Sequence, residues 1–124
     1  MKRLLVLILG CLLLAVSCKN TTDSVSSSEK PCPKLKIVND TNQNNGTYIW
    51  KIELVNYKFE PLYILQGESQ TFSLDKGMPA GNKDIYICIY IDSYNNGLQI
   101  KKNFTDGKTT TVRIYGYSGN YRVE

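Results

Sequence analysis

The distribution of hydrophobic residues divides the chain into two parts. Residues 4–16 form an almost unbroken apolar run (LLVLILGCLLLAV) behind the basic start Met1-Lys2-Arg3. From residue 34 onward, apolar residues come in short runs with a period of two, separated by Gly, Asn and Asp, and no convincing helical period appears. The first pattern is typical of a targeting segment, and the second predicts a domain built from β-strands.

Two runs show the strand pattern most clearly. Residues 47–55 (TYIWKIELV) place the side chains of Tyr48, Trp50, Ile52 and Leu54 on one face, and the more polar alternate face predicts a half-buried antiparallel strand. Residues 84–91 (DIYICIYI) place four isoleucines on one face and two tyrosines and a cysteine on the other. Because both of its faces are apolar, we expect this second run to be a central strand.

The strongest turn signal is the dipeptide Asp106-Gly107, which separates the strand-like runs 98–104 and 109–115. Asp-Gly in that position is typical of a type I′ hairpin, so we expect the two runs to pair with each other. Shorter strand-like runs bring the expected total to seven or eight strands, and these runs lie at residues 35–38, 62–65, 70–74 and 121–123.

The predicted fold class is therefore all-β. We expect residues 32–124 to form a small antiparallel β-sandwich of seven or eight strands with an immunoglobulin-like architecture, although the Cys–Trp–Cys spacing of antibody domains is absent. A small barrel is the alternative. A domain of this size buries only about 60–65% of the surface that its unfolded chain exposes, so a cross-link would help it.

Cys32 and Cys88 are candidates for that cross-link. Cys32 lies in the segment Pro31-Cys32-Pro33 before the first expected strand, and Cys88 lies in the middle of the expected central strand. Outside the cytoplasm two thiols favour a disulfide, and this one would close a loop of about 57 residues and stabilise the fold by about 4 kcal/mol. The alternative is a buried free Cys88 and an exposed Cys32.

The N-terminal segment matches a secretory signal, because a basic start precedes an apolar run of about 13 residues, shorter than the roughly 20 residues of a transmembrane helix. It ends in Ala15-Val16-Ser17-Cys18, which resembles a bacterial lipobox. Ala15 stands where that family prefers Leu, as in the relaxed lipoboxes of spirochaetes and some Bacteroidetes. The resemblance implies that residues 1–17 are a signal peptide and that Cys18 carries fatty acyl chains.

A lipidated Cys18 would make the membrane the first partner of this chain. Each buried CH₂ contributes about 0.8 kcal/mol, so two or three acyl chains hold a soluble domain firmly without a spanning helix. We then expect the protein at the cell membrane or outer membrane, facing outside the cytoplasm, with the Ser/Thr-rich residues 18–31 as a flexible linker. The alternatives are a second lipobox at Leu9-Gly10-Cys11 and an ordinary secretory signal that leaves Cys18 as a free thiol.

Composition excludes several functions. The chain has no histidine, which removes Ser-His-Asp triads, Cys-His pairs and imidazole acid-base chemistry. Without Lys2 and Arg3, 13 basic residues face 11 acidic ones, and the net charge of +2 is no footprint of a nucleic-acid partner. The carboxylates are scattered singly, mostly beside turns, and no serine has a visible base. We therefore expect no catalytic residue, no cofactor and no enzymatic activity.

A calcium loop is also not expected. Asp40-x-Asn42-x-Asn44 matches the first three ligands of an EF-hand loop, but Asn45 and Lys51 occupy the positions that need Gly and Glu. These residues are more typical of an Asn-rich turn, and we expect no metal site.

The aromatic residues are the remaining candidates for function: the chain has nine Tyr, one Trp and three Phe. Tyrosine and tryptophan combine a flat apolar face with a polar tip, which suits sugar rings and protein hot spots, although they are also ordinary strand formers. Six tyrosines near turns or on expected outer faces are candidate binding residues: Tyr57, Tyr63, Tyr94, Tyr115, Tyr117 and Tyr121.

These features predict a non-catalytic binding module for a protein or glycan ligand. Two alternatives stay open. One is a structural or accessory envelope protein that assembles through a sheet edge. The other is an inhibitor or immunity protein, for which residues 76–82 are the candidate protruding loop.

Overall fold

The computed structural model describes residues 31–42, 47–75, 78, 83–92 and 97–124. Within these segments the chain is all-β, and none of them is a helix of the length and apolarity that crossing a membrane requires. The predicted signal peptide, the lipidation site Cys18 and the predicted linker up to residue 30 lie outside the described residues.

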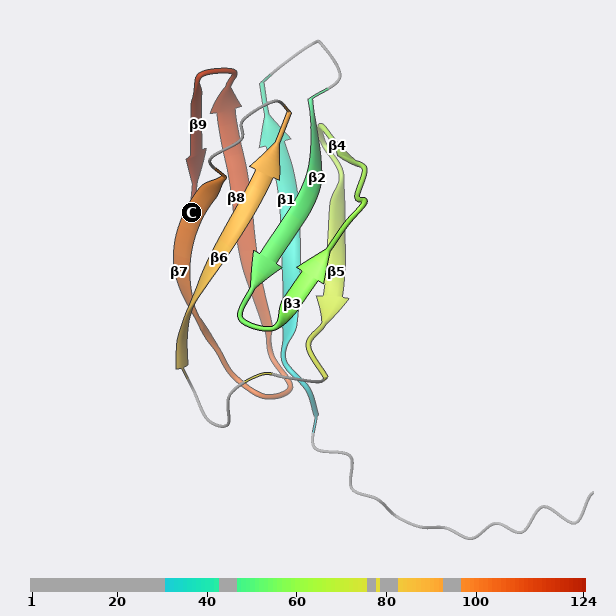
Figure 1. Ribbon diagram of the computed structural model, residues 1–124, viewed down its shortest axis with the longest axis vertical. Helices are drawn as coiled ribbons and strands as arrows, with labels where there is room; N and C mark the ends of the chain where they lie inside the picture. Colours follow the sequence, from blue (N-terminus) through green and yellow to red (C-terminus); the bar gives the residue numbers. More distant parts are fainter. Residues whose placement is uncertain (1–30, 43–46, 76–77, 79–82, 93–96) are drawn as a thin grey trace, which may run out of the picture.

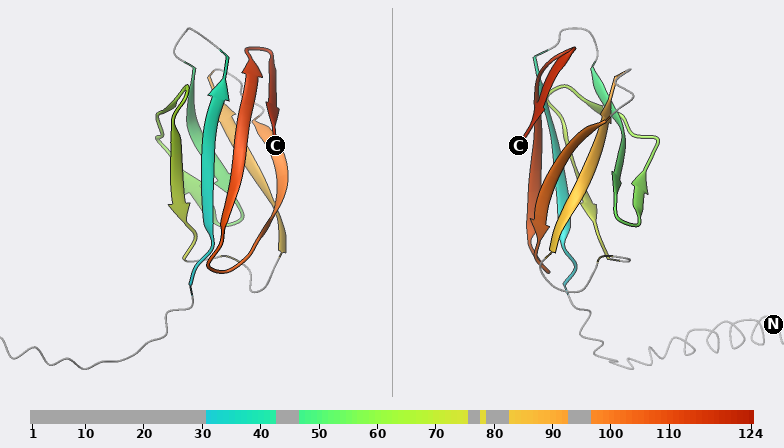
Figure 2. Two further views of the ribbon diagram at one scale, coloured as in Figure 1. Left: turned by 180° about the vertical axis from the view of Figure 1, so that it is seen from behind. Right: turned by 60° about the vertical axis from the view of Figure 1, so that its left-hand side comes forward.

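The described residues form nine strands in two sheets that face each other (Figures 1 and 2). The first sheet has the order β5-β1-β8-β9, with β5 at Ser69–Ser73, β1 at Lys34–Thr41, β8 at Thr109–Tyr117 and β9 at Asn120–Val123. The second has the order β3-β2-β6-β7, with β3 at Tyr57–Phe59, β2 at Tyr48–Leu54, β6 at Lys83–Ile91 and β7 at Leu98–Phe104. β4 (Ile64–Leu65) pairs with β2 beside this path. β3, which is three residues long, is the one described strand that the expected runs did not include.

The core lies between the sheets and takes apolar side chains from both. Every isoleucine of β6 is buried, while Tyr86 on its opposite face is 66% exposed. β6 lies between β2 and β7, so the prediction of a central strand is confirmed. The first sheet contributes Leu35 and Ile37 from β1 and Val112 and Ile114 from β8, all fully buried.

The sequence predicted a purely antiparallel sandwich, and this prediction is wrong for the first sheet, which is mixed. β1 and β8 run parallel, with Lys34 opposite Thr109 and Thr41 opposite Gly116. The other strand pairs are antiparallel. The segment that joins β1 to β8 passes through the second sheet and back, and a connection of that length leaves no local turn signal from which strand direction could be read.

The predicted hairpin through Asp106-Gly107 is wrong. β7 pairs with β6 in the second sheet, and β8 pairs with β1 and β9 in the first, so this turn carries the chain from one sheet to the other. Gly107 has φ of +74°, and the amide of Lys108 donates to the carbonyl of Thr105 at 3.1 Å. Asp106 does not share the positive φ that a type I′ turn requires at both central residues. The dipeptide signalled a chain reversal but not which strands pair.

A β-bulge in β2 overturns half of the face assignment made for that strand. Ile49 is opposite Ile91 and Lys51 is opposite Tyr90, so β2 takes two steps where β6 takes one. After the bulge, Ile52 and Leu54 are buried as expected. Before it, the buried side chains are Thr47 and Ile49 instead. Tyr48 and Trp50 therefore lie on the outer face of the second sheet rather than in the core.

Candidate binding site

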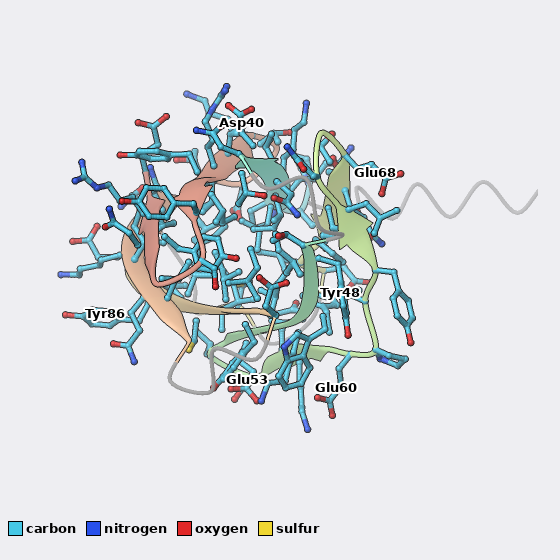
Figure 3. The ribbon with its side chains drawn as sticks, turned by 90° about the horizontal axis from the view of Figure 1, so that it is seen from above. Asp40, Tyr48, Glu53, Glu60, Glu68 and Tyr86 are labelled. Carbon is cyan, nitrogen blue, oxygen red and sulfur yellow. The ribbon has the colours of Figure 1, made fainter. Side chains whose placement is uncertain are left out.

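A groove on the outer side of the second sheet brings together side chains from three segments, and two of these segments contribute aromatic rings. It has a volume of about 270 Å³ and lies where β2 begins and β6 ends. Figure 3 shows Tyr48 together with Glu53 and Glu60 on one side of the molecule, with Asp40 on the opposite side. We call this groove of about 270 Å³ the aromatic groove. It is lined by Tyr48, Trp50, Pro61, Leu62, Tyr63 and Asp92.

Trp50 is held in the groove by two hydrogen bonds. Its indole N–H donates to the backbone carbonyl of Asp92 at 2.9 Å, and its own carbonyl accepts from the amide of Leu62 at 2.9 Å. The first bond joins β2 to the end of β6, and the second holds the segment between β3 and β4 against β2. The bulge thus places the Trp50 indole ring on the outer face of the second sheet, and these two hydrogen bonds fix its position there.

Asp92 organises the end of the groove. Its amide donates to the carbonyl of Tyr48 at 3.2 Å, and its Oδ1 accepts from the amide of Tyr48 at 3.3 Å. Its Oδ2 accepts from the hydroxyl of Tyr121. Asp92 has φ of +48°, a conformation that costs most residues energy but in which Asp is enriched. Burial, followed by the hydrogen bond to Asp92, raises the pKa of Tyr121, so its hydroxyl remains a donor at neutral pH.

Tyr63 is the most exposed ring of the groove. Its ring stacks on that of Tyr48 with centroids 5.6 Å apart and planes inclined by 24°, yet 71% of the residue is open to solvent. An apolar ring supported on one face and bare on the other is a ready contact for a flat ligand.

A charged cluster of Lys51, Glu53 and Tyr90 borders the groove at Trp50. The Nζ atom of Lys51 lies 3.7 Å from the Tyr90 ring centroid and 5.2 Å from that of Trp50, and it pairs with Glu53 at 3.2 Å. The Tyr90 hydroxyl donates to Oε2 of Glu53 at 2.9 Å. Hydrogen bonds from Tyr90 and then Lys51 lower the pKa of Glu53, while hydrogen bonds with Cys88 and Glu53 raise the pKa of Tyr90. The ammonium of Lys51 is therefore engaged by the cluster itself.

The six tyrosines proposed from the sequence do not form one surface. Tyr63 lines the groove, and Tyr121 contacts it through Asp92. Tyr57 stacks on Phe59 with centroids 5.8 Å apart and packs against the core. Tyr115 and Tyr117 border a separate hollow of about 230 Å³ at the first sheet. Tyr94 lies outside the described residues.

Sequence reasoning missed Tyr48, Trp50 and Asp92 as site residues. Strict alternation along residues 47–55 assigned the two rings to the face of Ile52 and Leu54, and only the bulge moves them outward. No sequence pattern marks a bulge at this point. Asp92 directly follows the apolar strand, which was its one available signal.

The candidate disulfide is not formed in the structure, where Cys32 and Cys88 are both free thiols. Cys32 precedes β1, where its carbonyl accepts from the amide of Gly107 at 3.3 Å. Cys88 lies on the outer face of β6, between the inward-facing Ile87 and Ile89. The second sheet and its core thus separate the Cys88 side chain from the first sheet, whereas a disulfide needs the two Cα atoms within about 7 Å.

Among the described residues, no group of three or more His, Cys, Asp or Glu side chains could hold a metal ion. Comparison of the chain with models of protein families, with curated proteins and with solved structures found no match.

Proposed function

We propose that this chain is a membrane-anchored lipoprotein whose small, immunoglobulin-like β-sandwich is a non-catalytic binding module outside the cytoplasm. The lipobox-like Ala15-Val16-Ser17-Cys18 and the Ser/Thr-rich segment after it support the anchor. The aromatic groove supports the binding role. Lipid on Cys18 fixes the domain at a membrane, and the groove faces a ligand there.

The observation that carries the binding role is the combination of exposure and rigidity at the groove. A folded domain normally buries its large rings, whereas here a bulge turns Tyr48 and Trp50 outward and Tyr63 remains 71% exposed. Hydrogen bonds and stacking hold the rings in place before any ligand arrives. Rigid aromatic anchors lose little conformational entropy on binding, which is how such residues contribute most to recognition.

Metabolic labelling with a palmitate analogue tests the anchor. The wild-type chain should incorporate label and partition into detergent, and Cys18→Ala should do neither. Cys11→Ala is the matched control, since it removes the competing lipobox cysteine and should keep full labelling. Label that persists in Cys18→Ala, or an unlabelled wild-type chain, would contradict the anchored-module proposal.

Assembly through a sheet edge is the second candidate, and β5 favours it. At the two ends of the pairing with β1, the amide of Asn39 donates to the carbonyl of Glu68 and the amide of Leu74 donates to the carbonyl of Pro33, both at 3.0 Å. Because hydrogen-bonded pairs alternate along an antiparallel ladder, the backbone groups of Ser69, Thr71 and Ser73 point away from β1. Apart from the buried Phe72, the side chains of β5 are exposed, polar and uncharged. By contrast, the edge strand β7 has the lysine pair 101–102 and β3 has Lys58, which discourage strand addition.

β5 is nonetheless only five residues long, which limits the ladder that a partner strand could form. The inhibitor alternative depended on the loop 76–82, of which Met78 alone lies within the described residues. The aromatic groove therefore remains the better-supported surface.

A further inference from the structure

We propose that the aromatic groove binds the ring of a neutral sugar, as part of a glycan at the cell surface. This inference rests on the proposed binding function and deepens it by naming the ligand class. Three properties of the groove support a neutral sugar as the ligand: its flat rings, its carboxylate and its paired backbone.

The rings match the apolar face of a pyranose. A sugar ring is amphipathic, with C–H groups on its faces and hydroxyls at its edge, so it stacks on an aromatic plane while its hydroxyls seek polar partners. Tyr63 supplies a plane that is open to solvent and supported from behind by Tyr48. Trp50 adds a second ring whose orientation is fixed by its bond to Asp92.

The Asp92 carboxylate supplies the polar partner. Among the described residues, Oδ1 accepts from the amide of Tyr48 and Oδ2 accepts from the hydroxyl of Tyr121. A carboxylate has about four lone-pair directions, more than these two bonds occupy, so a ligand hydroxyl can be a further donor. A site with a few fixed polar groups among aromatic walls is the usual composition of a small-molecule pocket.

The charge in the groove selects against acidic ligands. Asp92 is the one ionisable carboxylate among the six lining residues, and none of the six is basic. The ammonium of Lys51, 5.2 Å from the centroid of the Trp50 ring, is paired with Glu53 and lies against the Tyr90 ring. Among the described lining residues, a uronic acid or a phosphate would therefore meet a negative charge and no cation, which favours a neutral sugar.

The backbone of the groove selects against an extended peptide. A peptide strand binds by adding main-chain hydrogen bonds to a free edge. Here the amide and carbonyl of Tyr48 are both bonded to Asp92, and the carbonyl of Trp50 is bonded to Leu62. These backbone groups of β2 are therefore not open to a main-chain ladder, and we expect a ligand to be recognised through the side chains of the groove.

Affinity gel electrophoresis of the full chain in non-ionic detergent tests the inference. The gels contain a neutral β-glucan, mannan or galactan, or acidic polygalacturonate, and a gel without polysaccharide gives the reference mobility. Tyr63→Ala removes the exposed ring without opening the core. Tyr117→Ala is the matched control, because Tyr117 is also exposed, at 56%, but lies at the first sheet.

We expect at least one neutral polysaccharide to retard the wild type and Tyr117→Ala equally, with binding about tenfold weaker in Tyr63→Ala. Absence of retardation by every neutral gel, or retardation that Tyr63→Ala leaves unchanged, would overturn the inference. Retardation by polygalacturonate alone, lost in Tyr63→Ala, would overturn the neutral-sugar class while the binding module stands. Loss of the whole proposed function would instead appear in the labelling of Cys18, which is independent of the gels.

Discussion

The indole N–H of Trp50 donates to the backbone carbonyl of Asp92 at 2.9 Å, and this bond joins the bulged part of β2 to the residue that follows β6. It couples two irregular points of the second sheet, a β-bulge and a non-glycine residue with φ of +48°. Irregular backbone persists where surrounding contacts stabilise it, and such positions concentrate at functional sites. The aromatic groove lies where both irregularities meet.

Asp92 should support the fold as well as the groove. Replacement by Ala removes both acceptors and places a residue without a compensating side chain at positive φ, so Asp92→Ala should lower the free energy of unfolding by about 2 kcal/mol. Asp92→Asn retains one acceptor and tolerates this backbone conformation, so it should cost less than about 1 kcal/mol. Urea unfolding measures both variants, and equal losses would contradict the role given to the carboxylate.

The turn between β2 and β3 stores strain at Val55. This residue is β-branched and 52% exposed, and it has φ of +45°, which sterically disfavours a side chain such as valine. Val55→Gly should therefore stabilise the domain by about 1 kcal/mol, because relief of strain exceeds the entropy lost by glycine. Val55→Ile retains the branched side chain and should leave stability unchanged. A less stable Val55→Gly variant in urea unfolding would show that the strain is not there.

The direction of the backbone groups in β5 gives a matched pair of proline variants. Gln70 faces β1 in the ladder, so Gln70→Pro should cost about 3 kcal/mol or more through its lost bond and distorted pairing. Thr71 turns its amide outward, so Thr71→Pro should cost far less. Thermal unfolding compares the two. If Thr71→Pro also removes a protein that otherwise co-purifies from detergent extracts, edge assembly gains over the groove.

The pH dependence of the charged cluster follows from Glu53. Its pKa is lowered first by the hydrogen bond from Tyr90 and then by Lys51, so its contribution to stability is complete above the pKa of the unfolded chain. That contribution is lost as pH falls through the lower pKa of the folded state. Carboxyl NMR titration should show a pKa below the usual glutamate value, and Tyr90→Phe and Lys51→Met should each raise it. A Glu53 pKa that either variant leaves unchanged would contradict the assigned causes.

The sequence was sufficient for the strand pattern but not for the pairing. Period two identified β6 and its buried isoleucines, because that strand is regular along its whole length. The same rule failed in β2 at Trp50, where one extra residue reverses the faces. Asp106-Gly107 marked a real turn, yet partner choice depends on how the sheets pack, and local propensity does not encode that.

The sequence predicted the type of residue in the candidate site, which is aromatic, but not most of the residues that form it. An excess of tyrosine suggested an aromatic surface, and Tyr63 and Tyr121 do belong to the groove or touch it. The groove also needs Trp50 and Asp92, which lie 42 positions apart and meet through the pairing of β2 with β6. Contacts between distant positions of this kind become visible only once the register is known.

The single tryptophan gives the most direct measurement on the groove. Trp50 is the one Trp of the chain, so its emission reports on the groove without interference from another indole. Titration of the full chain with an oligosaccharide of the neutral polysaccharide that retards it should give a saturable change in emission, with about tenfold weaker binding in Tyr63→Ala. An emission spectrum that stays unchanged throughout the titration would place the ligand elsewhere and contradict the account.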